Sequence, residues 1–479
     1  MRGVCHGGPT HVRGEASSAG VEPTTSAFGG RRSIQLSYKD MSGHTSRPFT
    51  QCRPPAGARA TMPDPALSCA FVPASATQLP ANAQASAEGG VAPRWAVLTV
   101  TWANSLASGI LWSGVPFVTE RQYGFTKTQN LALALAEAAV YVVVAFFSGS
   151  LLRKLGTRGG LTPRGWLAGV FVLQVAASLV ALTGVWGLIA ASCILSAVGA
   201  SLWPVMESYV SSGQHGGNMR RSLGYFNVTW MSATGASLLL MAPLMAVGEA
   251  QYSLLAMLPV SALSLVLLRW FPACPAPHPP EHAHTHIAPQ YPYLLKATRF
   301  IIPASYVFIS VIGPVLPFLL RDLALDDGMK TPLASVWMFA RTFVVMALSQ
   351  VTFWHARWST LAVAVALLAG GFALTIMATS ATMAFVGLAM FGAGHGTIYY
   401  AGIYYAMAVG GAEVDAGGRF EALIGLGYVI GPLAVMFCDE SKGQLVGATW
   451  AAAMLGLLPA LAPWFAWRRR QAKLAGVAA

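Results

Sequence analysis

The most constraining feature of the sequence is a succession of long apolar stretches that begins near residue 94 and continues to about residue 468. A membrane-spanning α-helix needs about 20 apolar residues, because the hydrocarbon core of a bilayer is about 30 Å thick. Charge, glycine and proline divide this region into twelve stretches of that length. The strands of a membrane barrel would alternate apolar and polar residues instead. We therefore predict an all-α polytopic membrane protein with twelve transmembrane helices.

The composition of the chain excludes the soluble classes of protein. Hydrophobic residues make up 55% of the chain and charged residues only 10%, whereas about 25% of the residues in soluble domains are charged. So few charges cannot cover the surface of a soluble enzyme of this length. The region after residue 93 is therefore expected to lie in a lipid bilayer.

The predicted helices are joined by short connections. The two tightest hairpins, around Trp186 and Ser380, are expected to have almost no loop. The twelve helices are expected to begin near Trp95, Asn130, Trp166, Gly187, Ser222, Gln251, Lys296, Thr331, Ser359, Thr382, Gly418 and Gln444.

Lysine and arginine are distributed unevenly between the two sets of connections. From Arg94 onward, and leaving out Arg341 inside a helix, one set carries sixteen of these residues and the other carries five. Because basic connections stay on the cytoplasmic side, both termini are predicted to be cytoplasmic. We expect a multi-pass protein of the cell membrane, plasma or inner. The net charge of +12 belongs largely to these connections, so no nucleic-acid partner is expected.

The sequence also contains an internal repeat. Pro116 begins a Pro-Phe pair near the end of the first predicted helix, and Pro317 begins a second pair near the end of the seventh, 201 residues later. At nearly the same offset, the arginine pair ending at Arg221 precedes the fifth helix and Arg419 precedes the eleventh. Two six-helix halves with the same orientation are parallel repeats, related by an axis along the membrane normal.

Segments of different composition flank and divide the apolar region. The beginning of the chain is too poor in apolar residues to fold, and translation from Met41 or Met62 would shorten it. Many prolines disfavour a helix between the two halves. We predict a disordered tail at 1–93, a six-helix bundle at 94–271, a Pro/His-rich cytoplasmic linker at 272–295, a second bundle at 296–468 and a basic tail at 469–479.

Cysteine and histidine do not indicate a cofactor site. The six cysteines show neither metal-ligand spacing nor a paired pattern. The four histidines of the linker could bind a transition metal as neutral imidazoles, but their spacing is irregular. We expect no resident metal and no cofactor, and metal sensing by the linker stays an alternative.

Twelve helices, cytoplasmic termini, two parallel halves and a long central connection together resemble the major facilitator superfamily of secondary transporters. The resemblance covers about residues 94–470. It implies an alternating-access mechanism in which the two halves rock around a central cavity.

The best local support for this resemblance follows the second predicted helix. The family carries a glycine there, an Asp four residues later, and basic residues around a second glycine. Gly149, Lys154, Gly156 and Arg158 fit this pattern. Arg153 occupies the position of the Asp, so the charge lock that the Asp supports in the family is not expected in this chain. The resemblance implies that these five residues form the loop that controls the conformational change.

Two charged residues lie deep inside predicted helices, where a charge costs about 2.5–3.5 kcal/mol on insertion scales. Glu137 lies in the second helix and Arg341 in the eighth. The repeat relates Glu137 to Met338, one turn from Arg341, so both charges are expected at a similar depth. Glu137 is a candidate for proton coupling because loss of water favours the neutral carboxyl. Arg341 is a candidate for binding an anionic group or pairing with a carboxylate. Alternatively, each completes a local hydrogen-bond network.

Glu207 lies near the cytoplasmic end of the fourth predicted helix, just after Pro204. The proline is expected to kink this helix, because it lacks a backbone N–H and its ring clashes with the preceding turn. Glu207 is expected to pair with Arg220 or Arg221, which is a structural role.

The tenth predicted helix carries aromatic residues between glycines. His395, Tyr399 and Gly402 share one helical face, and the resemblance places this helix at the cavity. A phenol beside a glycine gap suits a polar organic ligand, although glycines also permit close helix packing. Asn104 in the first helix and Asn227 in the fifth are weaker candidates for the cavity, and either could hold helices together.

The sequence therefore predicts a secondary active transporter of a small organic solute, coupled to protons and working as a monomer in the bilayer. An ATP-driven pump is excluded because no Gly-x-x-x-x-Gly-Lys-Ser/Thr loop occurs. A membrane-embedded enzyme is disfavoured because neither His-Glu-x-x-His nor Gly-x-Ser-x-Gly occurs. A non-transporting sensor derived from a transporter stays an alternative. The predicted cavity does not distinguish sugars, organic acids, drugs and nucleosides, nor import from export.

Overall fold

Apolar stretches form helices where the sequence predicts them. A computed structural model describes residues 90–213, 216–276, 288–410, 414–438 and 441–477. The tail up to residue 89 lies outside the described residues, and so do residues 277–287, which contain the four histidines of the linker. Secondary structure in the described part is helical throughout, apart from one isolated bridge between Gly90 and Pro275.

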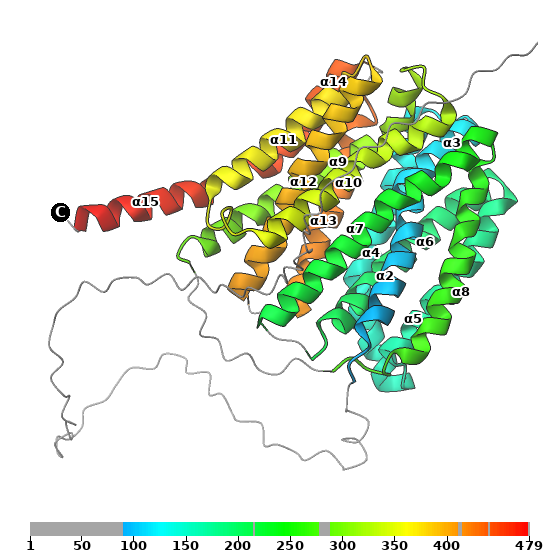
Figure 1. Ribbon diagram of the computed structural model, residues 1–479, viewed down its shortest axis with the longest axis horizontal. Helices are drawn as coiled ribbons and strands as arrows, with labels where there is room; N and C mark the ends of the chain where they lie inside the picture. Colours follow the sequence, from blue (N-terminus) through cyan, green and yellow to red (C-terminus); the bar gives the residue numbers. More distant parts are fainter. Residues whose placement is uncertain (1–89, 214–215, 277–287, 411–413, 439–440, 478–479) are drawn as a thin grey trace, which may run out of the picture. The chain divides into compact units, whose positions relative to one another are not determined.

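The first half of the chain contains the helices of the first six predicted spans (Figure 1). A π-helical segment divides the first span, and short 3₁₀ segments flank the fourth and sixth. The elements are α2 (Arg94–Gly109), η1 (Ile110–Gly114), α3 (Val115–Tyr123), α4 (Lys127–Gly159), α5 (Pro163–Val180), η2 (Ala181–Thr183), α6 (Val185–Ser211), α7 (Gly216–Val247), η3 (Ala250–Ala256), α8 (Met257–Leu267) and η4 (Leu268–Trp270).

The second half contains the remaining six spans. Ten helices of the described residues are long and apolar enough to cross a membrane. Of the other two, the first span is divided as above and the apolar part of α13 is short, Leu423–Val435. The all-α fold class with two six-helix halves is confirmed. The elements are α9 (Tyr291–Arg321), α10 (Asp327–Gln350), α11 (Trp358–Ile376), α12 (Ala381–Gly410), α13 (Val414–Val435), α14 (Lys442–Leu457) and α15 (Leu461–Val477).

The segment predicted as a conformational loop is helical. Gly149, Arg153, Lys154, Gly156 and Arg158 form the last turns of α4, which ends only at Gly159. The expectation of a loop was wrong in this respect, because the leucines and basic residues of this segment are good helix formers. The helix stops at a glycine in the left-handed conformation, with φ +66°. The three basic side chains are exposed.

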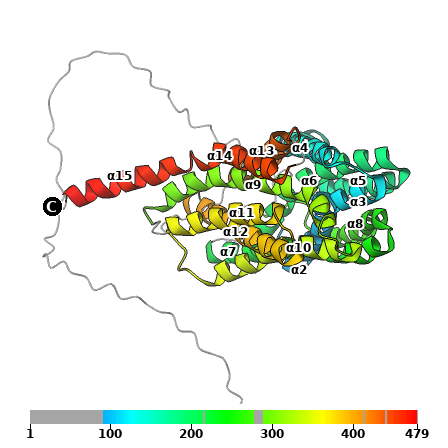
Figure 2. The ribbon, with the colours of Figure 1, turned by 90° about the horizontal axis from the view of Figure 1, so that it is seen from above.

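The two halves meet through two pairs of helices, and the internal repeat relates one pair to the other. α4 packs against α13, and α7 packs against α10. Figures 1 and 2 show both pairs from two directions. Because α4 corresponds to α10 and α7 to α13 in the repeat, the two contacts are equivalent. This arrangement is that of two parallel six-helix repeats.

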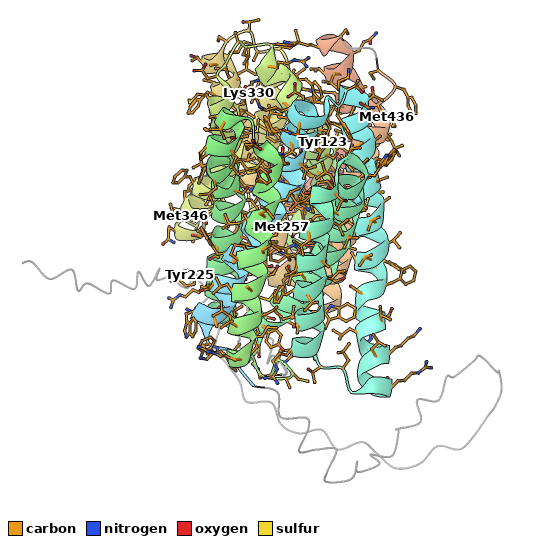
Figure 3. All side chains as sticks on the ribbon, turned by 90° about the vertical axis from the view of Figure 1, so that its right-hand side faces the viewer. Tyr123, Tyr225, Met257, Lys330, Met346 and Met436 are labelled. Carbon is orange, nitrogen blue, oxygen red and sulfur yellow. The ribbon has the colours of Figure 1, made fainter. Side chains whose placement is uncertain are left out.

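One end of the helix bundle joins the halves through charged side chains; we call it the Glu120 end. The guanidinium of Arg321 contacts the carboxylate of Glu120 at 3.2 Å, and these residues are 201 positions apart. The ion pair therefore joins equivalent positions of the two repeats. Arg121 forms a second ion pair with Asp327. Figure 3 shows Tyr123 and Lys330 toward this end and Tyr225 toward the other.

Candidate functional site

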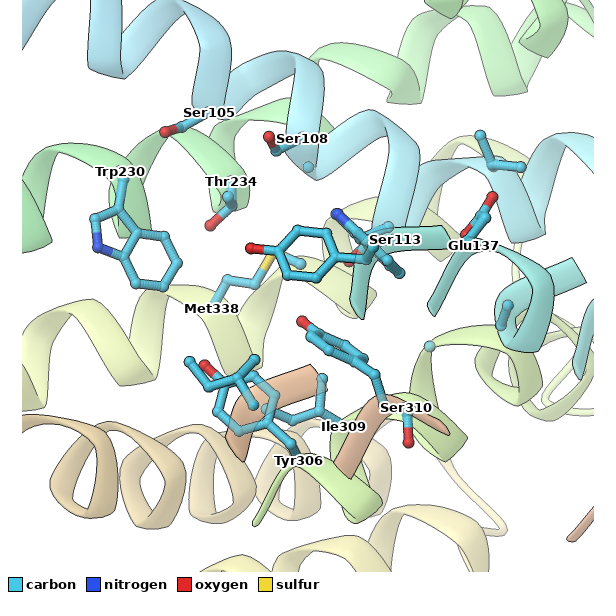
Figure 4. Close-up of a pocket in the computed structure, with 18 of the residues that line it drawn as sticks. Ser105, Ser108, Ser113, Glu137, Trp230, Thr234, Tyr306, Ile309, Ser310 and Met338 are labelled. Atoms are coloured by element: carbon cyan, nitrogen blue, oxygen red, sulfur yellow. The ribbon is translucent and has the colours of Figure 1, made fainter. Parts of the chain in front are cut away.

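A cavity of about 160 Å³ lies between the two halves. At about 30 Å³ for each water in the liquid, that volume corresponds to about five water molecules, or to a small organic solute in their place. Figure 4 shows side chains of α2, α4, α7, α9 and α10 around it. Its polar and aromatic lining residues include Trp112, Glu137, Tyr141, Trp203, Glu207, Trp230, Thr234, Tyr306, Trp337, Arg341, Tyr399, Glu421 and Tyr428.

Arg341 of α10 lines the cavity although its side chain is only 4% exposed. One guanidinium nitrogen donates a hydrogen bond of 3.0 Å to the hydroxyl of Thr234 on α7. The guanidinium carbon lies 4.6 Å from the ring centroid of Trp230 and 5.0 Å from that of Trp337. Such cation–π contacts stabilise a cation away from water. The Nε atom has no hydrogen-bond partner among the described residues.

A glycine on the neighbouring helix allows this position of Arg341. At Gly396 of α12, an added Cβ would lie 2.8 Å from the backbone oxygen of Arg341 and 3.1 Å from its Cα. Any larger residue there would push α10 away from α12. Gly392 and Gly394 likewise lie against the backbones of neighbouring helices, so these three glycines serve close packing, which was the structural alternative for them.

Glu137 of α4 lines the cavity on the side opposite Trp230 (Figure 4). Its side chain is 4% exposed, and one carboxyl oxygen has no hydrogen-bond partner among the described residues. No ion pair joins Glu137 to a basic side chain in the described part of the chain. Its backbone oxygen accepts a hydrogen bond of 2.7 Å from Ser196, which ties α4 to α6.

Glu207 of α6 also lines the cavity, a position that was not expected for it, and its predicted pairing with Arg220 stays a prediction. Within the described residues no ion pair connects it to Arg221, which is exposed, and the side chain of Arg220 is outside them. The prediction placed Glu207 by its distance from the helix end. A better signal was its spacing of four from Trp203, which puts both side chains on one helical face.

Glu421 of α13 is a cavity residue that the sequence reasoning missed. The hydroxyl of Tyr141 on α4 donates a hydrogen bond of 3.0 Å to its carboxylate, so the contact bridges the two halves. Glu421, Ile424 and Tyr428 all line the cavity, and their i, i+3, i+7 spacing marks one helical face. That spacing was visible in the sequence, but Glu421 lies close to the predicted start of its helix, where acids are common.

Aromatic rings connect the charged groups. Trp112 stacks on Tyr428 with ring centroids 5.0 Å apart, and Tyr428 meets Tyr306 edge-on at 5.2 Å. Tyr399 meets Trp230 edge-on at 5.6 Å. Tyr399 thus lies in the cavity wall, as the prediction for it supposed.

His395 lies behind this wall. Its side chain is fully buried, and its ring meets Tyr306 edge-on at 5.2 Å and lies 6.0 Å from Tyr399. Neither ring nitrogen has a hydrogen-bond partner among the described residues. His395 is therefore near the cavity residues but does not line the cavity.

The two asparagine candidates hold helices and side chains in place. The amide of Asn104 donates to the hydroxyl of Ser264 at 2.8 Å, which ties α2 to α8. The carbonyl of Asn227 accepts a hydrogen bond of 2.9 Å from the indole of Trp230. Neither asparagine is among the cavity-lining residues. Asn227 acts on the cavity only by orienting Trp230.

Comparison with solved structures gives the same architecture. The structure resembles that of a bacterial homologue of the human lysosomal transporter Spinster, inward-facing and unoccupied, with 12% sequence identity and a TM-score of 0.56 over 79% of this chain and 98% of that chain. It resembles the nucleoside transporter NupG with 12% identity and a TM-score of 0.56, over 78% of this chain and 98% of that chain. At such identities the likeness concerns the fold alone.

Comparison of the sequence with protein families identifies the chain. No curated protein sequence matches it. Residues 97–432 match the sequence profile of the Major Facilitator Superfamily, and this range contains every cavity residue described above. The chain belongs to the Major Facilitator Superfamily and is a membrane transporter, not an enzyme.

Proposed function

We propose that the protein is a secondary active transporter that moves a small organic solute by alternating access and couples this movement to protons through Glu137. The observation that carries the proposal is the buried carboxyl of Glu137, which lines the cavity and has no basic partner in the described residues. A buried ionised carboxyl without a partner is costly. Glu137 is therefore a group whose proton can be gained or lost as the cavity changes its access to water.

The arrangement of the halves supports alternating access. Ion pairs join the two halves at the Glu120 end. Glu207 and Glu421 line the cavity nearer the opposite end, because Glu207 lies close to the end of α6 and Glu421 close to the start of α13. Separation of the two halves at the Glu120 end would break these ion pairs and expose the same cavity to the other side. By the distribution of basic residues, the Glu120 end faces away from the cytoplasm, and both termini face it. The transporter works as a monomer.

Uptake into proteoliposomes tests the proposal with many solutes at once. A mixture of amino acids, peptides, nucleosides, sugars and organic acids is offered with and without a proton gradient, and mass spectrometry measures what accumulates. At least one solute should accumulate in the lumen only when the gradient is present. Accumulation of none of them, under either condition, would contradict transport and favour the sensor alternative.

The variant Glu137→Gln isolates the coupling group. It should abolish accumulation driven by the proton gradient and leave exchange of the same solute across the membrane intact. Glu249→Gln is the matched control, because Glu249 is exposed and lies outside the cavity. Gradient-driven accumulation at the wild-type level in Glu137→Gln would remove Glu137 from the coupling mechanism.

A further inference from the structure

The cavity holds two sites of opposite charge on either side of a group of tyrosines. We infer that the transported solute is a zwitterion whose ammonium and carboxylate groups are held apart by a short, flat apolar body. This inference deepens the proposed function and rests on it. It assigns the carboxylate of the solute to Arg341 and the ammonium group to Glu207 and Glu421.

The basic site consists of Arg341 and the groups that hold it. A guanidinium keeps its charge in proteins and offers five N–H donors. Thr234 accepts from one of them, and the indoles of Trp230 and Trp337 face the cation, but none of these groups carries negative charge. No ion pair joins Arg341 to a carboxylate within the described residues. A solute carboxylate would supply the missing charge and the fork-shaped acceptor that a guanidinium binds best.

The acidic site consists of two carboxyl groups contributed by opposite halves. Glu207 of α6 and Glu421 of α13 both line the cavity, and the two helices contact each other. The hydroxyl of Tyr141 holds Glu421 in place. Two carboxyl groups that share a site repel each other when both are charged, so a cation between them is stabilising. A solute ammonium group meets that requirement and offers three N–H donors.

A series of ring contacts joins the two sites. It begins at Tyr141, which donates to Glu421, and ends at Trp230, whose ring faces Arg341. The rings between them are those of Trp112, Tyr428, Tyr306, His395 and Tyr399. Aromatic faces suit a flat apolar body. Because this series of rings leads from the acidic site to the basic site, the charged groups of the solute should lie at its opposite ends.

A solute with only one charged group would leave one of the two sites without a partner of opposite charge. A monocarboxylate would neutralise Arg341 but leave Glu207 and Glu421 without a cation. An amine without a carboxylate would do the reverse. Only a molecule with both groups gives each of the two sites a partner of opposite charge in one binding event.

Three small molecules with the same ring test the inference: 4-(aminomethyl)benzoate, which is zwitterionic, 4-methylbenzylamine and 4-methylbenzoate. Thermal stabilisation of the purified full-length protein gives an apparent Kd for each. We expect the zwitterion to bind at least roughly tenfold more tightly than either singly charged compound, which corresponds to about 1.4 kcal/mol. Equal binding of the amine or of the carboxylate, or no binding of the zwitterion, would overturn the inference.

Substitutions at each site provide a second test of the inference. Glu421→Gln should remove the advantage of the zwitterion over 4-methylbenzoate, and Arg341→Gln should remove its advantage over 4-methylbenzylamine. Thr234→Val serves if Arg341→Gln does not fold, because it removes only the hydrogen bond to the guanidinium and should weaken the zwitterion and the carboxylate but not the amine. An unchanged ranking of the three compounds in the folded variants would contradict the two assigned sites.

Uptake separates this inference from the proposed function. Zwitterion binding without uptake into proteoliposomes would contradict transport and leave the assignment of the two sites intact. Proton-driven uptake of a different solute, with no zwitterion binding, would overturn the inference and leave the proposed function intact.

Discussion

The charges at the Glu120 end and the charges in the cavity are organised in opposite ways. At the Glu120 end, Glu120 pairs with Arg321, and Asp327 pairs with both Arg121 and Lys330. These side chains are partly or largely exposed, apart from the shielded Glu120 and Lys330. Every pair except the one within α10 joins the two halves.

In the cavity, four charged groups from four helices surround one space with no ion pair among the described residues. Glu137 and Arg341 are almost fully buried there, where an unpaired charge costs the most. A ligand of opposite charge, or a proton bound to the carboxyl group, would remove this cost. The charges at the Glu120 end therefore hold the two halves together, whereas the charges in the cavity are placed to bind a solute or a proton.

The largest effect is expected when the cavity receives an ion pair of its own. Met338 lines the cavity three residues before Arg341, at the position that the repeat relates to Glu137. In Met338→Glu the new carboxylate lies on the same helical face as Arg341 and pairs with it. We expect the apparent Kd of 4-(aminomethyl)benzoate to rise by roughly a hundredfold, which is about 2.7 kcal/mol.

Met338→Gln controls for the change of shape, because glutamine has the same size without the charge. It should weaken binding by much less than Met338→Glu, as measured by the same thermal stabilisation. Equal weakening of binding by the two variants would mean that binding of the zwitterion does not depend on an unpaired positive charge at Arg341.

A second prediction concerns the position of Arg341. Gly396→Ala puts a Cβ against the backbone of Arg341, so α10 and α12 must move apart. Overpacking of this kind costs about 1–3 kcal/mol, and the melting temperature should fall together with zwitterion binding. Gly169→Ala on α5 is the matched control, because no atom lies within 4 Å of its added Cβ. A stable Gly396→Ala protein with wild-type binding would show that this close contact is not needed.

The smallest effect is expected at the Glu120 end. The side chain of Arg321 is 58% exposed and that of Glu120 is 12% exposed. Because water reaches the guanidinium, the pair is expected to contribute about as much as a surface ion pair, about 0.2–1 kcal/mol. Glu120→Arg should therefore lower the melting temperature only slightly, and the double variant with Arg321→Glu should restore it. Added salt should reduce the difference. A large loss that the double variant does not restore would mean that Glu120 has a role beyond this pair.

The positions of the helices could be predicted well from the sequence because lipid sets the length of each apolar stretch. The second helix was expected near Asn130 and begins at Lys127, where Thr126 and Gln129 form a capping box. Its end was placed too early, because the basic turns up to Gly159 are helical but too polar to count as membrane-spanning. Hydropathy predicts which residues lie in the membrane, but it does not predict how far a helix continues outside the membrane.

The cavity could be predicted only in part. Glu137, Arg341 and Tyr399 line it, and their roles in binding and coupling stay predictions. They stood out because charge inside a helix, or a phenol beside glycines, is conspicuous in one segment. Glu421 and Glu207 did not, because both lie near helix ends, where an acid has an obvious structural explanation.

The sequence by itself determined that the chain lies in lipid, where its helices are, that it contains a repeat and which family it resembles. Each of these depends on the order and spacing of residues along the chain. Only the tertiary structure decided which polar residues face the same space. Asn104 meets Ser264 of a distant helix, and Tyr141 meets Glu421 of the other half. Such pairings depend on the crossing of helices far apart in the chain. Helical periodicity specifies the face that a residue occupies but not the helix that faces it.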